Sequence, residues 1–374
     1  RLAAGRGGCS LATSQLELSY LTGTTAERNN WFPVAFAADV DTNTMLPFDL
    51  FNVPWVLFRG LDGKMGCIKD ECAHRACPLS LGKVVEGKVQ CPYHGWEYTT
   101  GGQCTKQPSI KKMLPNVYVD TAPVVEREGL VYVWAGHLTP AVASAAAAAA
   151  GAGGGDDAGA DAGATAAAAD GSVQWTGLTE IPGSLLPPAG FSTMAEVAVD
   201  ISMEAEEVMA RLMDLKGRSA PHDKVALKPT VEKVSDDFFP KFAAEWLRGA
   251  WVPVPREAHF HPACVLDSTI GLVPVGDSSG GNYWNIHQMH VVLPARPGKT
   301  RLLFRLSADF VPAPELARQI GGEVWRNLAQ MVLHEQLEQV REGVESEDDG
   351  DEPGAGDRAV AAAQASYQEW RRAV

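Results

Sequence analysis

Two cysteine–histidine pairs are the residues of this chain best suited to chemistry. Cys72 and His74 form the first pair, and Cys91 and His94, after sixteen intervening residues, form the second. Two thiolates on one iron and two imidazoles on the other can hold a two-iron, two-sulfide cluster. Neutral imidazoles in place of anionic thiolates raise the reduction potential of such a cluster. The spacing therefore predicts an electron-transfer centre.

A structural zinc site is the alternative, because zinc also accepts two Cys and two His ligands. Zinc fingers usually pair Cys with Cys and His with His, whereas each segment here supplies one of each, so the spacing favours the iron–sulfur cluster. We interpret Cys77 and Cys104 as packed thiols near a cluster that already has four ligands. We expect Tyr93 and Trp96 to pack over the cluster and tune its polarity.

The segments CAHRACPL and CPYHGWEY, which contain the two pairs, resemble the signature of the Rieske-type aromatic-ring and porphyrin oxygenases. Within that group, flanking stretches such as NWFPVAFAADV, PWVLFRGLDGKMGC, IHQMHVVLP and KTRLLFRLSADF resemble the chlorophyllide a oxygenases. The resemblance implies an α+β chain in which an all-β Rieske [2Fe–2S] domain precedes a helix-grip-like oxygenase domain. It also implies that Cys72, His74, Cys91 and His94 are the cluster ligands.

The same resemblance implies a second metal site, and here the chain departs from the family pattern. The family carries an acidic residue, a His three positions later and another His five positions after that, with a distant carboxylate completing an Fe(II) site that activates O2. Asp214 and His222 match, but Gly217 stands at the first His position, and Glu345 corresponds to the carboxylate. We expect His222 and Glu345 to be vestigial, although binding iron with another ligand is an alternative. The family uses the residue matching Asp214 to bridge cluster and iron between subunits, a role that is doubtful here.

Other histidines are weaker candidates for the missing ligand. His287 and His290 are three apart in a predicted strand, so their side chains should point to opposite faces. His259 and His261 would share a face if their segment is extended, but no other ligand adjoins them. We expect these residues to lie in the core or on the surface, although His287 or His290 could contact a substrate. His334 should be solvated or face a partner.

The chain divides into four predicted parts. Residues 1–29 form an N-terminal segment whose opening, RLAAGRGGCS, is basic and rich in small residues, which fits the remnant of a targeting peptide or a sequence boundary. Residues 30–140 alternate short apolar runs with turn signals, which predicts the all-β domain. Residues 141–172 are a flexible linker, with Ala or Gly at 24 of 32 positions. Residues 173–374 mix helical and strand patterns, with an acidic loop at 345–357.

Helices are predicted at residues 203–215 and 317–341, and strands at 283–294 and 300–310, within this last part. No apolar run is long enough to span a bilayer, so any membrane contact should be peripheral. Seven cysteines, five of them between residues 67 and 104, favour a metal site in a reducing compartment over a disulfide framework.

The formal charge of −14 argues against binding to nucleic acid. The linker and the acidic loop carry 11 of these charges with no base, which leaves −3 for the other 329 residues. A local basic patch that docks an acidic ferredoxin is therefore compatible with the average charge.

The resemblance and the missing His together suggest the Rieske subunit of a heteromeric chlorophyll(ide) a oxygenase. Its cluster would pass electrons from ferredoxin to a mononuclear Fe(II) on a companion subunit in a ring-shaped hetero-oligomer. There O2 would oxidise the C7 methyl of chlorophyllide a or chlorophyll a to formyl, for chlorophyll b synthesis. Chloroplast location, at the thylakoid or inner envelope, follows from the same resemblance. Alternatives are a Rieske oxygenase for another tetrapyrrole, a non-catalytic scaffold or regulatory subunit, and a pure electron carrier.

Overall fold

The computed structural model describes residues 25–136, 181, 183–214, 251–274, 284–309 and 355–373, together with 329, 330, 332–334, 336–338, 340 and 341. Gly217, His222, Glu345 and the linker 141–172 lie outside the described residues. None of the helices in the described ranges is both long and apolar enough to cross a membrane.

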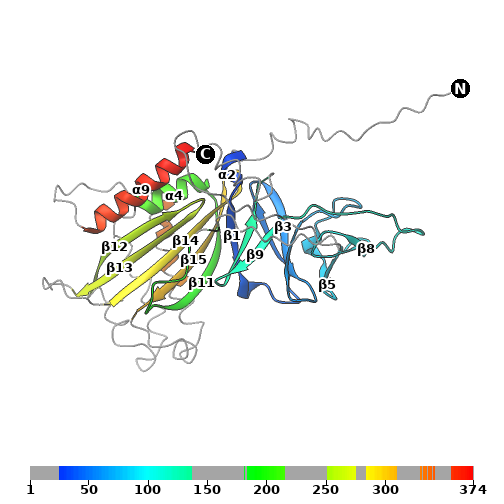
Figure 1. Cartoon of the computed structure of the whole chain (residues 1–374), viewed down its shortest axis with the longest axis horizontal. Helices are drawn as coiled ribbons and strands as arrows, with labels where there is room; N and C mark the ends of the chain where they lie inside the picture. Colours follow the sequence, from blue (N-terminus) through cyan, green and yellow to red (C-terminus); the bar gives the residue numbers. More distant parts are fainter. Residues whose placement is uncertain are drawn as a thin grey trace, which may run out of the picture.

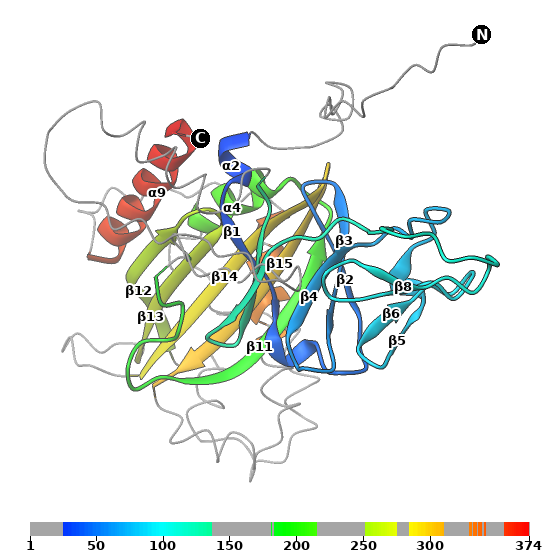
Figure 2. The ribbon, with the colours of Figure 1, turned by 45° about the vertical axis from the view of Figure 1, so that its right-hand side comes forward.

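An all-β domain forms the N-terminal part of the chain. Its ten strands are β1 (Trp31–Phe36), β2 (Leu46–Leu50), β3 (Val53–Arg59), β4 (Met65–Lys69), β5 (Lys83–Val85), β6 (Lys88–Gln90), β7 (Glu97–Tyr98), β8 (Cys104–Lys106), β9 (Val124–Arg127) and β10 (Leu130–Trp134). They form three sheets in the orders β1–β10–β9, β2–β3–β4 and β5–β6–β7–β8. The β5–β8 sheet lies at the end of the molecule farthest from the C-terminal helix (Figures 1 and 2). Short helical turns are α2 (Thr25–Arg28), η1 (Ala37–Asp39) and η2 (Leu79–Leu81).

One antiparallel five-stranded sheet dominates the rest of the chain. Its strands are β11 (Ser192–Ile201), β12 (Trp251–His261), β13 (Val265–Pro274), β14 (Trp284–Arg296) and β15 (Lys299–Ala308), in the order β11–β15–β14–β13–β12. Helices α4 (Ala205–Asp214) and α9 (Ala355–Ala373) cover one face of this sheet (Figure 1). The predicted strands at 283–294 and 300–310 correspond to β14 and β15, and the helix predicted at 203–215 corresponds to α4. The described residues between 329 and 341 are helical, as the pattern predicts.

The acidic loop predicted at 345–357 ends earlier than expected, because Ala355 already begins α9. The following run AVAAAQAS is rich in the best helix former, which explains the early start. Ala363 and Tyr367 are buried against the sheet and anchor the helix. The sequence patterns did not predict helix α9 or strands β11 to β13.

Strand alternation lets the large sheet support a core on each face. Ile286 and Val292 of β14 pack in a core with the helices, whereas Met289 and Val291 pack in a second core with β1 and β10 of the N-terminal domain. Because neighbouring residues of a strand point to opposite faces, β14 is buried on both sides. The two domains therefore share one continuous apolar seam.

A buried arginine crosses this seam. Arg305 of β15 is 3 % exposed, and its Nε donates to Glu196 Oε1 at 2.8 Å. Its other nitrogens donate to the carbonyl oxygens of Leu185 (3.2 Å) and Glu128 (3.5 Å), and its guanidinium lies 5.6 Å from the centre of the Phe36 ring. The contacts to Glu128 and Phe36 tie the large sheet to the N-terminal domain.

We predict that Arg305→Met lowers the free energy of unfolding by about 2–4 kcal/mol, because it leaves a partly buried carboxylate and carbonyl groups without their donor. Urea or thermal unfolding measures the change. Arg341→Ala is the control, since this exposed arginine is paired with the half-exposed Glu338, and its substitution should cost less than about 1 kcal/mol. Equal changes in the free energy of unfolding for the two substitutions would contradict a role of Arg305 in joining the two domains.

Candidate functional site

The predicted ligand pairs lie on two loops with the same backbone hydrogen bonds. In the first loop, which follows β4, Cys72 N–H donates to the Cys77 carbonyl at 2.9 Å, and Ala76 N–H donates to the Cys72 carbonyl at 2.8 Å. The second loop, between β6 and β7, repeats both: Cys91 N–H donates to the Trp96 carbonyl at 2.8 Å, and the N–H four residues after Cys91 donates back to it at 3.0 Å. The two loops are therefore copies of one turn.

The residue four positions after each cysteine adopts a left-handed conformation, with φ of 52° at Ala76 and 69° at Gly95. Glycine adopts this conformation without steric cost, whereas alanine pays roughly 1 kcal/mol or more. The first loop retains this geometry with additional support from the Asp70 carboxylate, which accepts from the N–H and hydroxyl of Ser80 at 2.6 and 2.5 Å. Backbone hydrogen bonds thus close both loops, and the first loop has this side-chain contact in addition.

The four predicted ligands come together at the tip of the N-terminal domain. Cys72 and Cys91 are each 2 % exposed, while His74 and His94 are half-buried, with ring centres 4.6 Å apart. Burial is the main cause of the raised pKa of the Cys72 thiol, and the adjacent Cys91 thiol raises it further. A coordinated metal deprotonates such a thiol outright.

These side chains fit a two-iron cluster by their chemistry and by one unsatisfied atom. Nδ1 of His74 is buried and has no hydrogen-bond partner among the described residues, so it is available as a ligand. The six cysteines of the described ranges are free thiols, so neither Cys72 nor Cys91 is taken up by a disulfide. When bound, the cluster would accept and release one electron at a time.

Two aromatic residues pack against the histidine ligands, and Trp96 meets the expectation more fully than Tyr93 does. Trp96 stacks on His74 with ring centres 4.7 Å apart, and its indole N–H donates to Ser109 Oγ at 2.8 Å. The ring centre of Tyr93 lies 3.8 Å from that of His94, but Tyr93 is 60 % exposed, so it lies at the rim of the site.

Tyr98 is a further residue of the site, because its hydroxyl contacts Cys72, and the sequence patterns did not predict it. Its hydroxyl oxygen is 3.2 Å from Cys72 Sγ and accepts from the Ala73 N–H at 3.2 Å. Because the oxygen already accepts this bond, its own hydrogen is free to donate to the sulfur of a metal-bound thiolate. Tyr98 is fully buried, which raises the pKa of its phenol and keeps that hydrogen in place.

We predict that Tyr98→Phe lowers the midpoint potential of the cluster. A hydrogen bond to the thiolate stabilises the more negative reduced state, and losing about 0.5–1.5 kcal/mol corresponds to roughly 20–65 mV for one electron. Protein-film voltammetry or a redox titration measures the shift. Tyr93→Phe removes a hydroxyl at the rim and should leave the potential unchanged; equal potentials in all three proteins would contradict the assignment.

The predicted mononuclear-site residues fall largely outside the described ranges. Asp214 is the last residue of α4, and its side chain lies outside the described part of the structure. Across the described portion of the chain, no group of three or more His, Cys, Asp or Glu residues has donors placed to hold one metal ion.

The other histidines occupy the sheet as predicted from strand geometry. His287 and His290 lie on opposite faces of β14, His259 and His261 share a face of β12, and His334 is exposed. The sequence patterns indicated no acidic partner for the four histidines of β12 and β14.

Asp267 of β13 is the acidic partner of three of these histidines. Its carboxylate lies 3.2 Å from His259, 3.4 Å from His261 and 3.6 Å from His287. Burial acts to raise the pKa of Asp267, but hydrogen bonding to His261 and His287 outweighs it and holds the pKa well below its usual range. Pairing between β12, β13 and β14 brings these side chains together, and chain order does not reveal it.

His290 faces the helices and belongs to a buried amide network. Its Nε2 lies 3.0 Å from Gln336 Oε1, and the Gln336 amide donates to Gln288 Oε1 at 2.8 Å. A cavity of about 50 Å³ borders all three side chains. Burial lowers the pKa of His290 from 6.5 to about 4.

This shift predicts a pH dependence of folding. The unfolded histidine binds a proton below about pH 6.5, whereas the folded one stays neutral down to about pH 4. Stability should therefore fall by roughly 3 kcal/mol as the pH drops through this window. Urea unfolding at several pH values should show a flatter profile in His290→Gln but not in the exposed control His259→Gln. Parallel profiles in all three proteins would contradict this role for His290.

Comparison with known proteins agrees with the site geometry. Residues 30–123 match the Rieske [2Fe–2S] domain. The N-terminal domain is therefore a Rieske domain, and its two loops are the expected place for the cluster.

Two curated relatives match most of the chain. Chlorophyllide a oxygenase of Arabidopsis thaliana is 37% identical over 315 residues, which cover 83% of this chain and 51% of the relative. Chlorophyllide a oxygenase of Chlamydomonas reinhardtii is 37% identical over 317 residues, covering 83% and 42%. Both are described as chloroplastic. The chain thus spans about half the length of the curated relatives it matches.

A solved structure shares the fold over almost the whole chain. The crystal structure of apo dicamba monooxygenase superimposes with a TM-score of 0.53 at 22% identity, covering 92% of this chain and 97% of that one. The Rieske domain and the large sheet with its helices therefore share the fold of that structure.

Proposed function

We propose that this chain is the Rieske electron-transfer subunit of a heteromeric chlorophyll(ide) a oxygenase. The supporting observation is the pairing of a complete cluster site with a family pattern that lacks one iron ligand. All four cluster ligands lie together on two matched loops, whereas Gly217 stands where the mononuclear site needs its first His. The similarity to chlorophyllide a oxygenases over 83% of the chain favours this substrate class.

The proposed division of labour places the mononuclear Fe(II) on a companion oxygenase subunit. His222 and Glu345 are then vestigial, since one imidazole and one carboxylate are too few for a stable two-His, one-carboxylate site. In a ring-shaped hetero-oligomer, the cluster of this chain would face the iron of its neighbour. Asp214 is the candidate bridge between them.

The exposure of the ligands suits this role. The buried cysteines keep the thiolate side of the cluster away from solvent, and the half-buried His74 and His94 give the outward path for an electron. His74 has Trp96 stacked on one face, which fixes its ring orientation. These contacts hold the exit side of the site in one position for transfer to a partner.

The surface around the cluster suits an acidic electron donor such as ferredoxin. Residues 72–119 contain six basic and two acidic residues, a local charge of +4 in a chain of −14. Five of these cations, Arg75, Lys83, Lys106, Lys111 and Lys112, are exposed, and Lys106 is paired with Glu97. The same segment also has exposed apolar side chains, namely Leu81, Tyr93, Met113, Leu114 and Tyr118. Such a surface steers an acidic protein and then buries apolar area against it.

The proposed reaction converts the C7 methyl of chlorophyllide a or chlorophyll a to formyl, giving the chlorophyll b form. Two successive hydroxylations, each consuming O2 and two electrons, give a geminal diol that loses water. The chloroplast is the proposed location, with peripheral contact to the thylakoid or inner envelope membrane. A Rieske oxygenase for a different tetrapyrrole and a non-catalytic scaffold subunit are the alternatives.

Reconstitution with the companion chain tests the proposal. The native complex, given chlorophyllide a, reduced ferredoxin and O2, should form the formyl product, whereas either chain alone should not. Cys91→Ser should abolish both the cluster absorption and product formation. Cys77→Ser, which alters a half-buried thiol beside the site, is the matched control and should retain both.

Each contrary result selects an alternative. Product formation by the Cys91→Ser complex would make this chain a scaffold. Turnover of another tetrapyrrole but not of chlorophyllide a would overturn the substrate assignment, and turnover by this chain alone would overturn the division of labour.

A further inference from the structure

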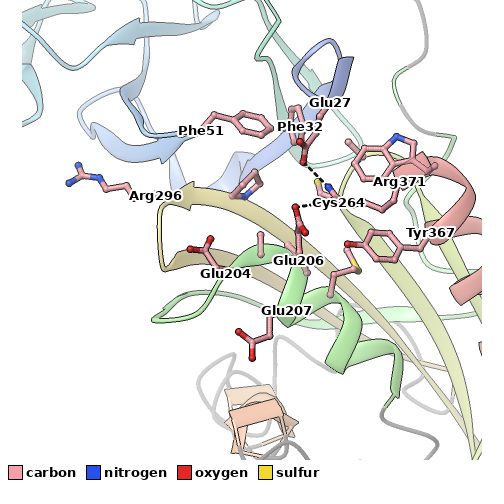
Figure 3. Close-up of a pocket in the computed structure, with 16 residues that line it drawn as sticks. Glu27, Phe32, Phe51, Glu204, Glu206, Glu207, Cys264, Arg296, Tyr367 and Arg371 are labelled. Atoms are coloured by element: carbon pink, nitrogen blue, oxygen red, sulfur yellow. Dashed lines mark ion pairs between the residues drawn. The ribbon is translucent and has the colours of Figure 1, made fainter. Parts of the chain in front are cut away.

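Two hollows of the molecule differ in the state of their polar groups. The larger one, of about 640 Å³, lies between α2, α4 and α9 (Figure 3). Its charged side chains already have partners, such as Arg371 for Glu206 and Arg211 for Glu207, and none of its lining residues has a buried N or O atom without a hydrogen bond. The smaller cavity, of about 50 Å³ beside His290, does have such atoms.

The hydrogen-bond chain of the smaller cavity determines which of its atoms carry protons. Gln336 donates its amide N–H to Gln288 Oε1 at 2.8 Å, so the amide oxygen of Gln336 is the atom that lies 3.0 Å from His290 Nε2. An amide oxygen can only accept, and Nε2 of His290 is therefore the protonated nitrogen. Burial lowers the pKa of His290 to about 4 and keeps the imidazole neutral. Its Nδ1 consequently carries a lone pair and no hydrogen.

Two polar atoms at this cavity have no partner among the described residues. One is Nδ1 of His290, an acceptor, and the other is Nε2 of Gln288, an amide nitrogen that donates. His290 is 3 % exposed and Gln288 is 1 % exposed, so bulk water reaches neither side chain. Both lie on the same face of β14, two positions apart, and both line the cavity. Buried polar groups are nearly always hydrogen-bonded, so this donor and acceptor point to a bound molecule.

The cavity is small and has apolar walls. The His290 ring centre lies 4.9 Å from that of Phe304, which supports the ring from the sheet side. Met213 of α4 and Ala363 of α9 are among the apolar residues that line the side of the helices. A water molecule needs about 10–15 Å³ of such space, so the cavity admits roughly three to five waters or a ligand group of that size.

The charge of the lining excludes one class of ligand. Glu257, which is exposed, is the only charged side chain among the lining residues, since His290 is neutral. A carboxylate ligand would meet the lone pair of His290 Nδ1 and would find no cation beside it. A buried anion without a cation or enough donors is strongly disfavoured. The ligand should therefore be uncharged.

We propose that this cavity binds a small uncharged molecule, or the uncharged polar end of a larger one, that carries an N–H or O–H donor next to a carbonyl oxygen. The donor binds His290 Nδ1, and the carbonyl oxygen accepts from Gln288 Nε2. Primary amides and lactams are the simplest members of this class. The cavity borders α9, at the end of the molecule opposite the β5–β8 sheet, and takes no part in electron transfer. This proposal and the proposed function can therefore fail independently.

Three probes of nearly equal size test the proposal on the full chain. Acetamide carries both the donor and the acceptor, acetone lacks the donor, and acetate is charged and also lacks the donor. Acetamide should bind about fivefold or more tightly than either, because a ligand that leaves a buried polar group unpaired is rejected. Titrations followed by the NMR signals of the probes measure the three dissociation constants.

The nitrogen-15 signal of His290 Nδ1 is a second measurement. In protein labelled at its histidines, saturation with acetamide should move this signal toward the value of a protonated nitrogen, because Nδ1 then accepts a hydrogen bond. Acetone and acetate should not move it. Comparison with His290→Gln assigns the signal.

A substitution and its control locate the binding. Gln288→Leu nearly keeps the size of the side chain but removes the donor, and it should weaken the binding of acetamide about fivefold or more. Gln103→Leu changes an exposed glutamine of the Rieske domain and should bind acetamide as the unaltered chain does. Circular dichroism checks that each variant is folded.

Equal affinities for the three probes, or an Nδ1 signal that stays in place at saturating acetamide, would overturn the proposal and leave ordered water as the occupant of the cavity. Undiminished binding of acetamide by folded Gln288→Leu would overturn it as well. If Gln288→Leu does not fold, the Nδ1 signal of the unaltered chain decides.

Discussion

Two short loops must hold four ligands of opposite character, and the rest of the Rieske domain follows from that constraint. The thiols are buried and the imidazoles half-buried, and each loop makes the same turn, with a left-handed residue four positions after the cysteine. The strands that carry the loops, β4, β6 and β7, pack around the cysteines in a core of their own, which includes Tyr98 and Trp96. Backbone hydrogen bonds that close each turn therefore fix the positions from which the four ligands extend.

The large sheet connects this tip to the remainder of the chain. Strand β14 is buried on both faces, and Arg305 reaches from β15 to the N-terminal domain. The β2–β3 turn adds backbone hydrogen bonds from Phe51 and Asn52 to the end of β14, each 2.7 Å long. These contacts make the Rieske domain and the sheet one packed unit, which suits the proposed transfer of electrons to a partner subunit.

Local patterns in the sequence predicted some of these features and not others. The Cys and His spacing identified the cluster loops, and strand alternation separated His287 from His290 correctly. The hydrogen bond from Tyr98 and the gathering of histidines around Asp267 depend on which strands pair, and that information is not local. Helix α9 was missed because its alanine-rich sequence follows an acidic, glycine-containing stretch that reads as a loop. The residues that line the pocket between α2, α4 and α9 come from segments more than 300 residues apart, so no local motif predicts it.

The central claim is that this chain holds the electron-transfer cluster and leaves oxygen activation to another polypeptide. Mössbauer spectroscopy of the isolated chain, loaded with isotope-enriched iron, tests it most directly, because thiolate-bound and imidazole-bound irons give different signals. The account predicts two inequivalent irons in a ratio of about one to one and no further iron component. A stoichiometric third, mononuclear ferrous component would contradict the division of labour, and a single type of iron site would contradict the cluster assignment itself.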